Sequence, residues 1–499
     1  MRKLVRLGVS ILFALSSIGH AQQLTVAQGT GPETLDAQRS TVQQTLNVSQ
    51  HINEALLRFD YQQGGVVPLL ASSFEPVSDD VWEFKLRDGV SFTNGEPFNA
   101  DTVKFSVERI ASPELNAPGA VEVRAITEIE VVDDLTVRFH TDGPSPTLPL
   151  NLTRVAMVPP GYIGEVGNAG FGQNPVGTGP FQLERWVRGD RVVLSSNSDY
   201  WGGTPTLEQV TFVAVPEEAT RMAALQSGEV DIAVQVSIEQ APLLERMGFA
   251  VEAVPSLRIM MVALPVSGEE NVYRDQRVRQ ALNYAVDKES LVTNILGGYG
   301  EVIEGQPLSS EYFGFNPEVA AYPFDPERAR ELLEEAGYGE GNPLEISLYG
   351  PQGRYTRDSE ILQAIGGNLR NVGVNADVQV LDWSLFIERL VAKDFDGGVF
   401  WGATTVPDGG IWQSSMLASG AAYSLYANAE IDEMLEEAGR TVDSEQRLAI
   451  YQDMAEKLHD EAPFIYLYQQ VDLYGVAPSV SGWTPSPDES IYLWGVAID

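Results

Sequence analysis

The chain has 499 residues, with 32 Lys and Arg against 70 Asp and Glu, and a formal net charge of −38. Binding to nucleic-acid phosphates requires clustered cations, so this composition excludes nucleic acid as a partner, and it disfavours anionic membrane surfaces. The chain has no cysteine, which excludes disulfides, thiolate metal sites and cysteine nucleophiles. At about 150 residues per domain, the length predicts about three structural units.

Residues 1–21 have the pattern of an export signal. Three cations fall within the first six residues, an apolar run covers residues 7–15, and the small residues Gly19 and Ala21 occupy the −3 and −1 places of a cleavage site. The apolar run is shorter than the ~20 residues that a membrane span needs. We therefore predict cleavage after Ala21 and a periplasmic protein, which is not lipid-anchored because it has no cysteine to carry the lipid.

Strand and helix patterns alternate along the rest of the chain, which predicts a mixed α/β protein. Residues 81–86 alternate apolar and polar, and Asp88-Gly89 then predicts a hairpin turn into residues 90–92. Asp325-Pro326 combines a cap residue with a proline at the first helical position, so a helix begins there and ends at Gly337. Further helices are predicted from apolar spacing over residues 275–296, 361–373 and 443–458.

The search for catalytic motifs finds no nucleophile elbow, zinc-protease motif or phosphate-binding loop. His51, His140 and His459 are far apart and have no ligand-like spacing, so we expect no enzyme activity, no metal and no cofactor. Trp383 and Trp401 lie at predicted strand ends beside loop-rich sequence, as suits a ligand cleft. Ordinary core packing is the alternative role for each tryptophan.

Short segments spread over almost the whole chain, in order, carry a resemblance to a known family. They are GPETLD (31–36), WEFKLRDGV (82–90), NGEP (94–97), ADTV (100–103), NPVGTGPF (174–181), YW (200–201), VRQAL (278–282), AVDK (285–288), ARELL (329–333), GY (337–338) and VGV (372–374). Together they resemble the family 5 extracellular solute-binding proteins of bacterial ABC importers, the dipeptide-, oligopeptide- and nickel-binding class.

The resemblance implies a two-lobed periplasmic binding protein fold of the α/β class, with an inserted third subdomain and a hinge between the lobes. Lobe I would be discontinuous, over residues 22–50, 176–262 and 475–499. The inserted subdomain would be residues 51–175, and lobe II residues 263–474. Ligand would bind between the lobes and be enclosed by hinge closure. The protein would act as a monomer that delivers a small-molecule or peptide ligand to permease subunits in the inner membrane.

The resemblance also suggests ligand-binding residues. Peptide-binding relatives have a Trp-x-x-Asp segment whose acid meets the peptide amine, and here the segment is Trp401-Gly402-Ala403-Thr404, with Asp408 as a possible substitute acid. Arg354 resembles the arginine that receives the ligand carboxylate, because a guanidinium fork suits that group. The full set of expected ligand-binding residues is Gly31, Arg354, Tyr355, Arg357, Trp383, Trp401, Gly402, Thr404 and Tyr468.

Several alternatives remain open from the sequence. An opine, an oligosaccharide or another non-peptide solute could occupy the same scaffold, because a fold does not define a ligand. A sensory receptor that hands its ligand to a chemoreceptor would have the same sequence features. A secreted hydrolase would need two acids facing each other across a cleft, and the sequence neither places nor forbids such a pair.

Overall fold

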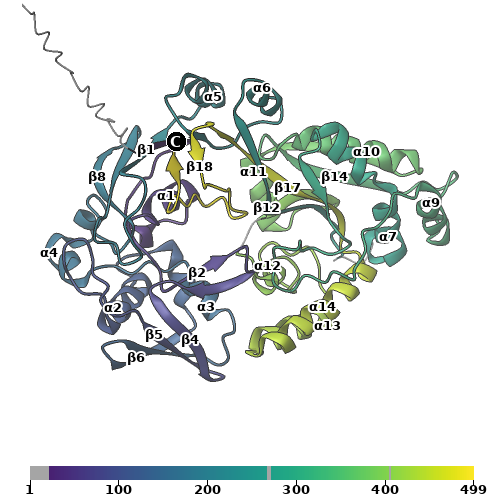
Figure 1. Cartoon of the computed structure of the whole chain (residues 1–499). Helices are drawn as coiled ribbons and strands as arrows, with labels where there is room; N and C mark the ends of the chain where they lie inside the picture. Colours follow the sequence, from purple (N-terminus) through teal and green to yellow (C-terminus); the bar gives the residue numbers. More distant parts are fainter. Residues whose placement is uncertain (1–21, 267–270, 404–405) are drawn as a thin grey trace, which may run out of the picture.

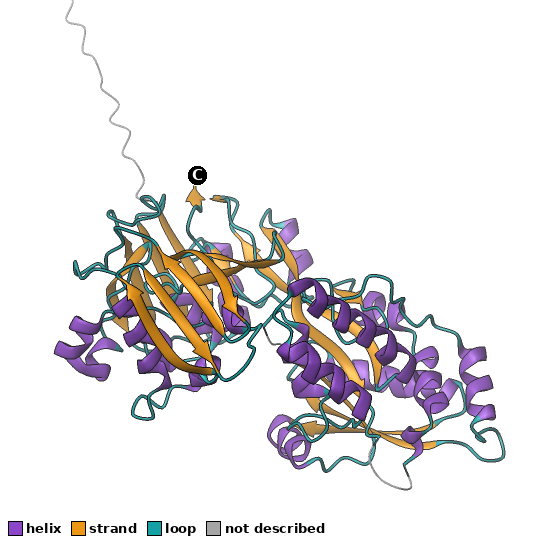
Figure 2. Ribbon diagram, turned by 90° about the horizontal axis from the view of Figure 1, so that it is seen from below, coloured by secondary structure: helices purple, strands orange, loops and turns teal. Residues whose placement is uncertain are grey.

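The computed structural model describes residues 22–266, 271–403 and 406–499, so the predicted export signal lies outside the described residues. Within them, one eleven-stranded sheet has the order β15-β14-β16-β12-β17-β11-β1-β10-β9-β8, and β13 pairs with β17. Figure 1 labels several of these strands, and Figure 2 shows two bodies joined by a narrower waist. The strands of this sheet are β1 (Gln23–Gln28), β8 (Phe181–Val187), β9 (Arg191–Ser196), β10 (Gln209–Ala214), β11 (Ile232–Ala233), β12 (Ala250–Ala263), β13 (Gly300–Val302), β14 (Glu345–Gln352), β15 (Asn375–Asp382), β16 (Gly398–Ala403) and β17 (Phe464–Val476).

The long antiparallel strands β12 and β17 connect the two bodies. Residues 250–255 of β12 pair with residues 471–476 of β17, and residues 259–263 pair with residues 464–469. The register breaks between Pro255 and Ile259, where proline offers no amide hydrogen to the ladder. On one side of the break β17 also pairs with β11, and on the other side β12 pairs with β16. The break therefore separates the part of the sheet in one body from the part in the other.

The first body, which contains β1 and β8–β11, has apolar clusters on both faces of its sheet. Val26 packs in a cluster with Phe212 and Ile491, whereas the next residue, Ala27, packs in a second cluster with Leu225. This division follows from the alternation of side chains along a strand. The helices of this body are α1 (Gln43–Ser49), α5 (Glu218–Ser227) and α6 (Ala241–Arg246).

A separate four-stranded sheet, in the order β4-β5-β7-β6, lies between α1 and β8 in the sequence. Its core includes Phe84, Val103 and Phe139. The predicted strand at residues 81–86 is confirmed as β5, but the predicted hairpin is wrong, because β5 pairs with β4 and β7 rather than with residues 90–92. The elements of this region are β2 (Leu57–Asp60), β3 (Gly65–Pro68), β4 (Ala71–Ser78), β5 (Val81–Leu86), α2 (Ala100–Ala111), β6 (Ile126–Asp133), β7 (Thr136–Thr141), α3 (Leu148–Leu152) and α4 (Pro160–Phe171).

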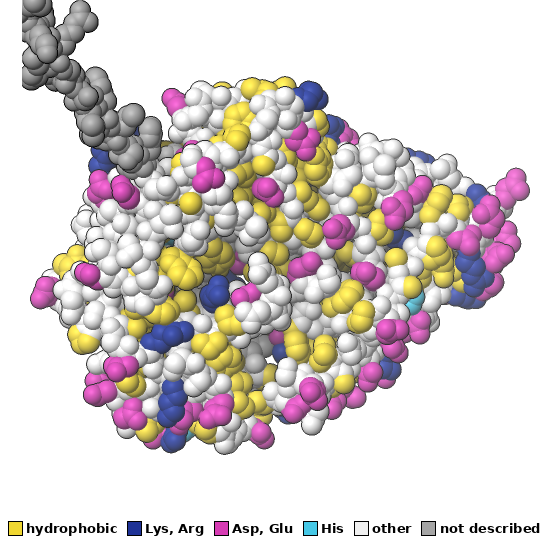
Figure 3. All heavy atoms as spheres, in the orientation of Figure 1, with side chains coloured by type: hydrophobic (Ala, Val, Ile, Leu, Met, Phe, Trp, Pro, Cys, Tyr) yellow, Lys and Arg dark blue, Asp and Glu magenta, His cyan; other side chains and the backbone are white. Residues whose placement is uncertain are grey.

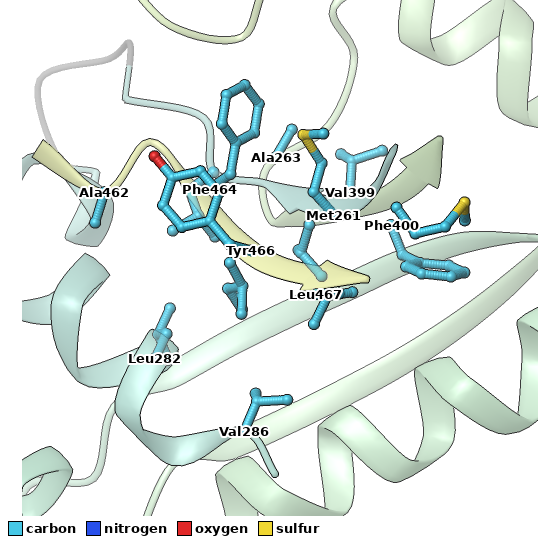
Figure 4. Close-up of a cluster of buried hydrophobic side chains, with 14 of the residues drawn as sticks. Met261, Ala263, Leu282, Val286, Val399, Phe400, Ala462, Phe464, Tyr466 and Leu467 are labelled. Carbon is cyan, nitrogen blue, oxygen red and sulfur yellow. The ribbon is translucent and has the colours of Figure 1, made fainter. Parts of the chain in front are cut away.

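The second body packs helices around β14, β15, β16 and the ends of β12 and β17. Figure 4 shows part of its core, to which Met261, Leu282, Phe400 and Leu467 contribute from strands and a helix distant in sequence. No helix within residues 22–266, 271–403 or 406–499 is both long and apolar enough to cross a membrane. The helices of this body are α7 (Gln276–Ala285), α8 (Lys288–Ser290), α9 (Pro326–Glu335), α10 (Asp358–Asn371), α11 (Trp383–Ala392), α12 (Gly409–Met416), α13 (Ala429–Arg440) and α14 (Ser444–Glu461).

Most predicted helices of this body are confirmed, and one is wrong in its length. Asp325 caps α9 as expected, its carboxylate accepting from the Arg328 amide. The predicted helix over residues 275–296 ends at Ala285, because Val286 is extended, with φ −96° and ψ 122°. The side chain of Asp287 then caps a new turn by accepting from the Ser290 amide. Apolar spacing continued through this break, which is why the pattern did not reveal it.

Candidate ligand-binding site

The turn that presents Arg354 and Tyr355 is held by one buried carboxylate. Asp358, the first residue of α10, accepts hydrogen bonds from the amide of Arg354 at 2.8 Å and from that of Tyr355 at 3.1 Å. Gly353 enters the turn with φ +71°, in the left-handed region that glycine adopts without strain. The backbone at this end of β14 is therefore well defined, and it directs two adjacent side chains differently.

The guanidinium of Arg354 lies on aromatic rings and is exposed. Its Cζ is 5.4 Å from the ring centre of Tyr355 and 5.2 Å from that of Trp383, within the range of a cation–π contact. Trp383 in turn stacks on Phe386 at 5.7 Å. Arg354 forms no ion pair with any residue of the described ranges. Such a cation can accept a carboxylate from outside the chain.

Tyr355 and Gly402 are joined by a hydrogen bond beneath this cation. The Tyr355 hydroxyl donates to the Gly402 carbonyl at 2.8 Å, and burial raises the pKa of Tyr355. Gly402 pairs with Met260, which pairs with Tyr468, so the three positions lie on one face of the sheet. A Cβ at Gly402 would lie 2.2 Å from Met260 Sδ, so this position has no room for a side chain. We call Arg354, Tyr355, Trp383 and Gly402 the Tyr355 cluster.

Trp401 lies on the face of β16 opposite to that of its neighbour Gly402. It is 5% exposed, belongs to the core of the second body and packs against Tyr423 at 5.7 Å. Its Nε1 is buried and has no hydrogen-bond partner among the described residues. Tyr468 is also almost fully buried, at 2% exposed, and burial raises its pKa. In this conformation both side chains contribute packing rather than an open ligand surface.

The other expected residues have different contacts from those of the Tyr355 cluster, or lie outside the described residues. Arg357 pairs with Glu360 at 2.8 Å and also with Glu239, which belongs to the first body. This ion pair therefore connects the two bodies. Gly31 follows β1, and the nearest side chain to a Cβ built on it is that of Ala214, at 3.5 Å. Thr404 lies outside the described residues.

Asp408 is not available as a substitute acid for a ligand amine. Its carboxylate caps α12, accepting from the Gly410 and Ile411 amides. It also forms two hydrogen bonds of 2.7 Å with the guanidinium of Arg447. Both side chains are almost completely buried, at 5% and 6% exposed. The idea that Asp408 serves the amine is therefore wrong, because moving it would leave a buried arginine unpaired.

The structure also reveals residues of interest for ligand binding that no sequence motif identified, among them Arg258 beside Tyr355. Arg258, on β12, has its guanidinium carbon 5.8 Å from the ring centre of Tyr355 and pairs with Glu489 at 3.1 Å. Tyr492 and Trp494, in the C-terminal segment, are 48% and 54% exposed. Arg258 comes beside Tyr355 and Glu489 only through contacts between distant segments of the chain. The sequence shows a Trp near the end of the chain but not its exposure, so it offered no signal for these residues.

One open cavity lies apart from the Tyr355 cluster. It has a volume of about 430 Å³ and is lined by Ser72, Leu86, Arg87, Asp88, Val90 and Trp201. Arg87 lies 4.6 Å from the ring centre of Trp201. Figure 3 shows hydrophobic side chains prominent in the middle of one face and acidic ones gathered at the end that carries α9. Within the described ranges, no group of three or more His, Asp or Glu residues is placed to hold a metal ion.

Comparison with known proteins places this geometry in a family. Residues 65–424 match the bacterial extracellular solute-binding proteins, family 5. The glutathione-binding protein GsiB of Pectobacterium atrosepticum is 30% identical, covering 98% of this chain and 96% of its own. The oligopeptide-binding protein AppA of Bacillus subtilis is 26% identical, covering 96% and 92%. HbpA2 from Haemophilus parasuis, a solved structure, has a TM-score of 0.87 at 24% identity, covering 96% and 100%.

These matches confirm the predicted two-lobed α/β fold, so the first and second bodies are its two lobes. They also agree with the expectation that the protein binds a solute without converting it. The chain belongs to family 5 of the bacterial extracellular solute-binding proteins, which are not enzymes.

Proposed function

We propose that this protein captures a peptide-like solute through the carboxylate of that solute, and delivers it to the permease of an ABC importer. The observation that carries the proposal is Arg354, an exposed cation held against the rings of Tyr355 and Trp383 with no ion-pair partner in the described ranges. The names of two relatives, a glutathione-binding and an oligopeptide-binding protein, support a peptide-like ligand. A guanidinium fork matches a terminal carboxylate in geometry and charge.

The solute lies between the two lobes in this proposal, and the break in the β12–β17 ladder at Pro255–Ile259 is the hinge. The boundaries expected at residues 262 and 474 then move to this break: lobe I comprises residues 22–50, 176–255 and 471–499, the inserted subdomain residues 51–175, and lobe II residues 259–470. The Arg357–Glu239 ion pair supports a contact surface between the lobes. Export through residues 1–21 releases a periplasmic monomer that meets inner-membrane permease subunits. Closure of the lobes around the solute creates the form that the permease receives.

In this proposal the protein offers a charged partner to the carboxylate of a peptide ligand but none to its amine. Thr404 carries no charge, and Asp408 is engaged by Arg447, so neither supplies a carboxylate to a buried ammonium. An ion buried without a partner loses several kcal/mol. We therefore expect that acetylation of a peptide's amine does not weaken its binding. Calorimetry with free and N-acetylated forms of the same dipeptides measures this, and a strong preference for the free amine contradicts it.

The carboxylate contact is tested with dipeptides whose C-terminus is either free or amidated. Loss of one partner of a desolvated charge pair costs about 2–5 kcal/mol, so Arg354→Ala lowers the affinity for the free acid at least about 30-fold. Arg354→Lys also weakens binding, because an ammonium lacks the planar fork. Trp383 and Tyr355 stay in place in both variants.

Arg389→Ala is the matched control for this experiment. Arg389 also lies on two aromatic rings, 4.9 Å from that of Tyr349 and 4.5 Å from that of Phe395, but it pairs with Asp394 at 3.5 Å. Its removal leaves the affinity unchanged. Equal affinity of Arg354→Ala and the parent refutes the role of Arg354. Recovery of a native solute without any acidic group, by mass spectrometry after gentle purification, refutes the proposed ligand class.

A further inference from the structure

Arg258 is a buried arginine whose hydrogen-bonding capacity is largely unused. The residue is 8% exposed, and its Nε is buried with no hydrogen-bond partner among the described residues. Within those residues, the one side-chain acceptor of its guanidinium is Glu489, at 3.1 Å from Nη2. A guanidinium has five N–H donors, and buried polar groups are almost always satisfied. This shortfall indicates that another acceptor completes the site.

The place of Arg258 in the fold is next to the Tyr355 cluster. It lies on β12 within the Pro255–Ile259 register break, at the junction of the two lobes. Its side chain borders Gly402, since a Cβ at Gly402 would come within 3.2 Å of Arg258 Cγ. Its guanidinium carbon is 5.8 Å from the Tyr355 ring centre, and that of Arg354 is 5.4 Å from the same centre. Two guanidinium groups therefore border one tyrosine ring, and their carbons lie no more than about 11 Å apart.

The acid that pairs with Arg258 in this structure, Glu489, belongs to a distant segment of the chain. Glu489 belongs to the C-terminal segment, which is attached to β12 by the hydrogen bond from the Leu257 amide to the Pro487 carbonyl, at 3.0 Å. Its side chain is 32% exposed, and its backbone has φ +63°, a conformation uncommon for a residue with a side chain. Because this carboxylate is partly exposed, it regains water when it leaves the arginine, and the incoming acidic group takes over the buried charge of Arg258.

A second acid, Asp472, also lies near Arg258. Burial and the charge of Glu489 raise the pKa of Asp472 to about 6, while Arg258 acts in the opposite direction. Asp472 forms no ion pair with Arg258 in the described residues, and its Oδ2 has no hydrogen-bond partner there. It therefore does not satisfy the open donors of Arg258.

We propose that Arg258 binds a second acidic group of the solute, and that Glu489 occupies this position when solute is absent. This inference rests on the proposed function and narrows its ligand class to compact solutes with two acidic groups. One carboxylate binds Arg354 and the other displaces Glu489 from Arg258. In a chain with 70 acidic and 32 basic residues, two arginines border one tyrosine ring. Within the described residues Glu489 pairs with one of them and no acid pairs with the other, an arrangement that a dianionic ligand explains.

The experiment compares Ala-Glu with Ala-Gln, which share the terminal carboxylate and differ only in the second acidic group. The parent protein binds Ala-Glu at least about 30-fold more tightly than Ala-Gln, as expected for a desolvated charge pair. Arg258→Met removes this preference and retains binding of Ala-Gln. Glu489→Gln leaves Arg258 in place and tightens Ala-Glu binding by up to about 5-fold, so the test does not depend on one variant. Thermal unfolding confirms that each variant is folded.

Glu461→Gln is the control for Glu489→Gln. Glu461 also pairs with a buried arginine, Arg279, at 2.7 Å, and is 36% exposed, so its change leaves the affinity for Ala-Glu unaltered. A parent that binds both dipeptides equally, or an Arg258→Met variant that keeps the preference, overturns this inference while peptide binding stands. A parent that binds neither dipeptide, but carries a non-peptide solute through purification, overturns the proposed peptide class instead. In that case, equal binding of the recovered solute by the parent and Arg258→Met overturns the role of Arg258 as well.

Discussion

Arg447 and Arg354 are two arginines of the same lobe in opposite situations. Arg447 is buried and has acceptors for its Nε and both Nη atoms: Asp408 twice at 2.7 Å, the Tyr451 hydroxyl at 3.1 Å and the Ala438 carbonyl at 3.3 Å. Arg354 is exposed, rests on two rings and forms no ion pair within the described ranges. The N–H donors of an arginine that contributes to the fold are hydrogen-bonded by neighbouring groups of the protein, as those of Arg447 are. One left on an aromatic surface in so acidic a chain is placed to meet a group from outside.

The largest expected effect is the loss of stability when Arg447, the arginine with a full set of acceptors, loses its acidic partner. Asp408→Asn leaves the Arg447 charge buried without its partner, and such a loss costs about 3–5 kcal/mol of unfolding free energy. Arg354→Ala changes the same quantity by no more than about 0.5 kcal/mol, as for other surface substitutions. Urea denaturation of the three proteins measures both values. Similar stability losses for the two variants would erase the distinction between the two arginines.

The two tryptophans allow the same distinction among aromatic residues. Trp401→Ala empties a core position and lowers the unfolding free energy by about 3–5 kcal/mol. Trp383→Ala removes a ring under Arg354, and weakens carboxylate binding by about 2- to 5-fold, the contribution of an exposed cation–π contact. Thermal unfolding and calorimetry on both variants separate the effects. If Trp401→Ala proves stable and deficient in binding, Trp401 belongs to the ligand surface after all.

Asp472 predicts how pH acts at the lobe junction. Its pKa of about 6 in the folded protein exceeds the value of about 4 for an unfolded chain, so the folded state holds the proton more tightly. Its contribution to stability is therefore full below about pH 4, falls as pH rises to about 6, and is absent above that. Asp472→Asn is more stable than the parent by about 1–3 kcal/mol at pH 7 and equal to it at pH 4. Melting curves at both pH values measure this, and a constant difference would show that the carboxyl does not titrate in this range.

The smallest expected effect concerns the contact between the lobes. Glu239→Gln removes the ion pair that Arg357 forms across them, and an exposed pair contributes about 1 kcal/mol or less. We expect a modest rise in the radius of gyration of the unliganded protein at low salt, measured by X-ray scattering. Glu360→Gln, which removes the partner of Arg357 within the same lobe, leaves the radius unchanged. If Glu360→Gln raises the radius of gyration more than Glu239→Gln does, Arg357 does not contribute to the contact between the lobes.

Local patterns in the sequence determined much of the fold. The cap at Asp325, the alternation at residues 81–86 and the helix predicted over residues 443–458 were all visible in the sequence, because each depends on neighbours a few residues apart. The helix break at Val286 was not legible, because the apolar spacing continues through it. The family segments also led to Arg354 and Tyr355, which the structure brings together with Trp383 and Gly402.

Only the tertiary structure decided which of these side chains is buried and which is exposed. Trp401 and Gly402 are adjacent in sequence but lie on opposite faces of β16, because successive residues of a strand alternate. Arg258 meets Tyr355 and Glu489 through contacts between residues about 100 and 230 positions apart, and no local pattern encodes such a separation. The sequence by itself determined an acidic chain of alternating strands and helices, and its N-terminus and family segments predicted export, two lobes and an arginine for a carboxylate. The long-range packing of β12, β14 and the C-terminal segment determined the surroundings of that arginine, because burial and pairing are properties of the folded chain.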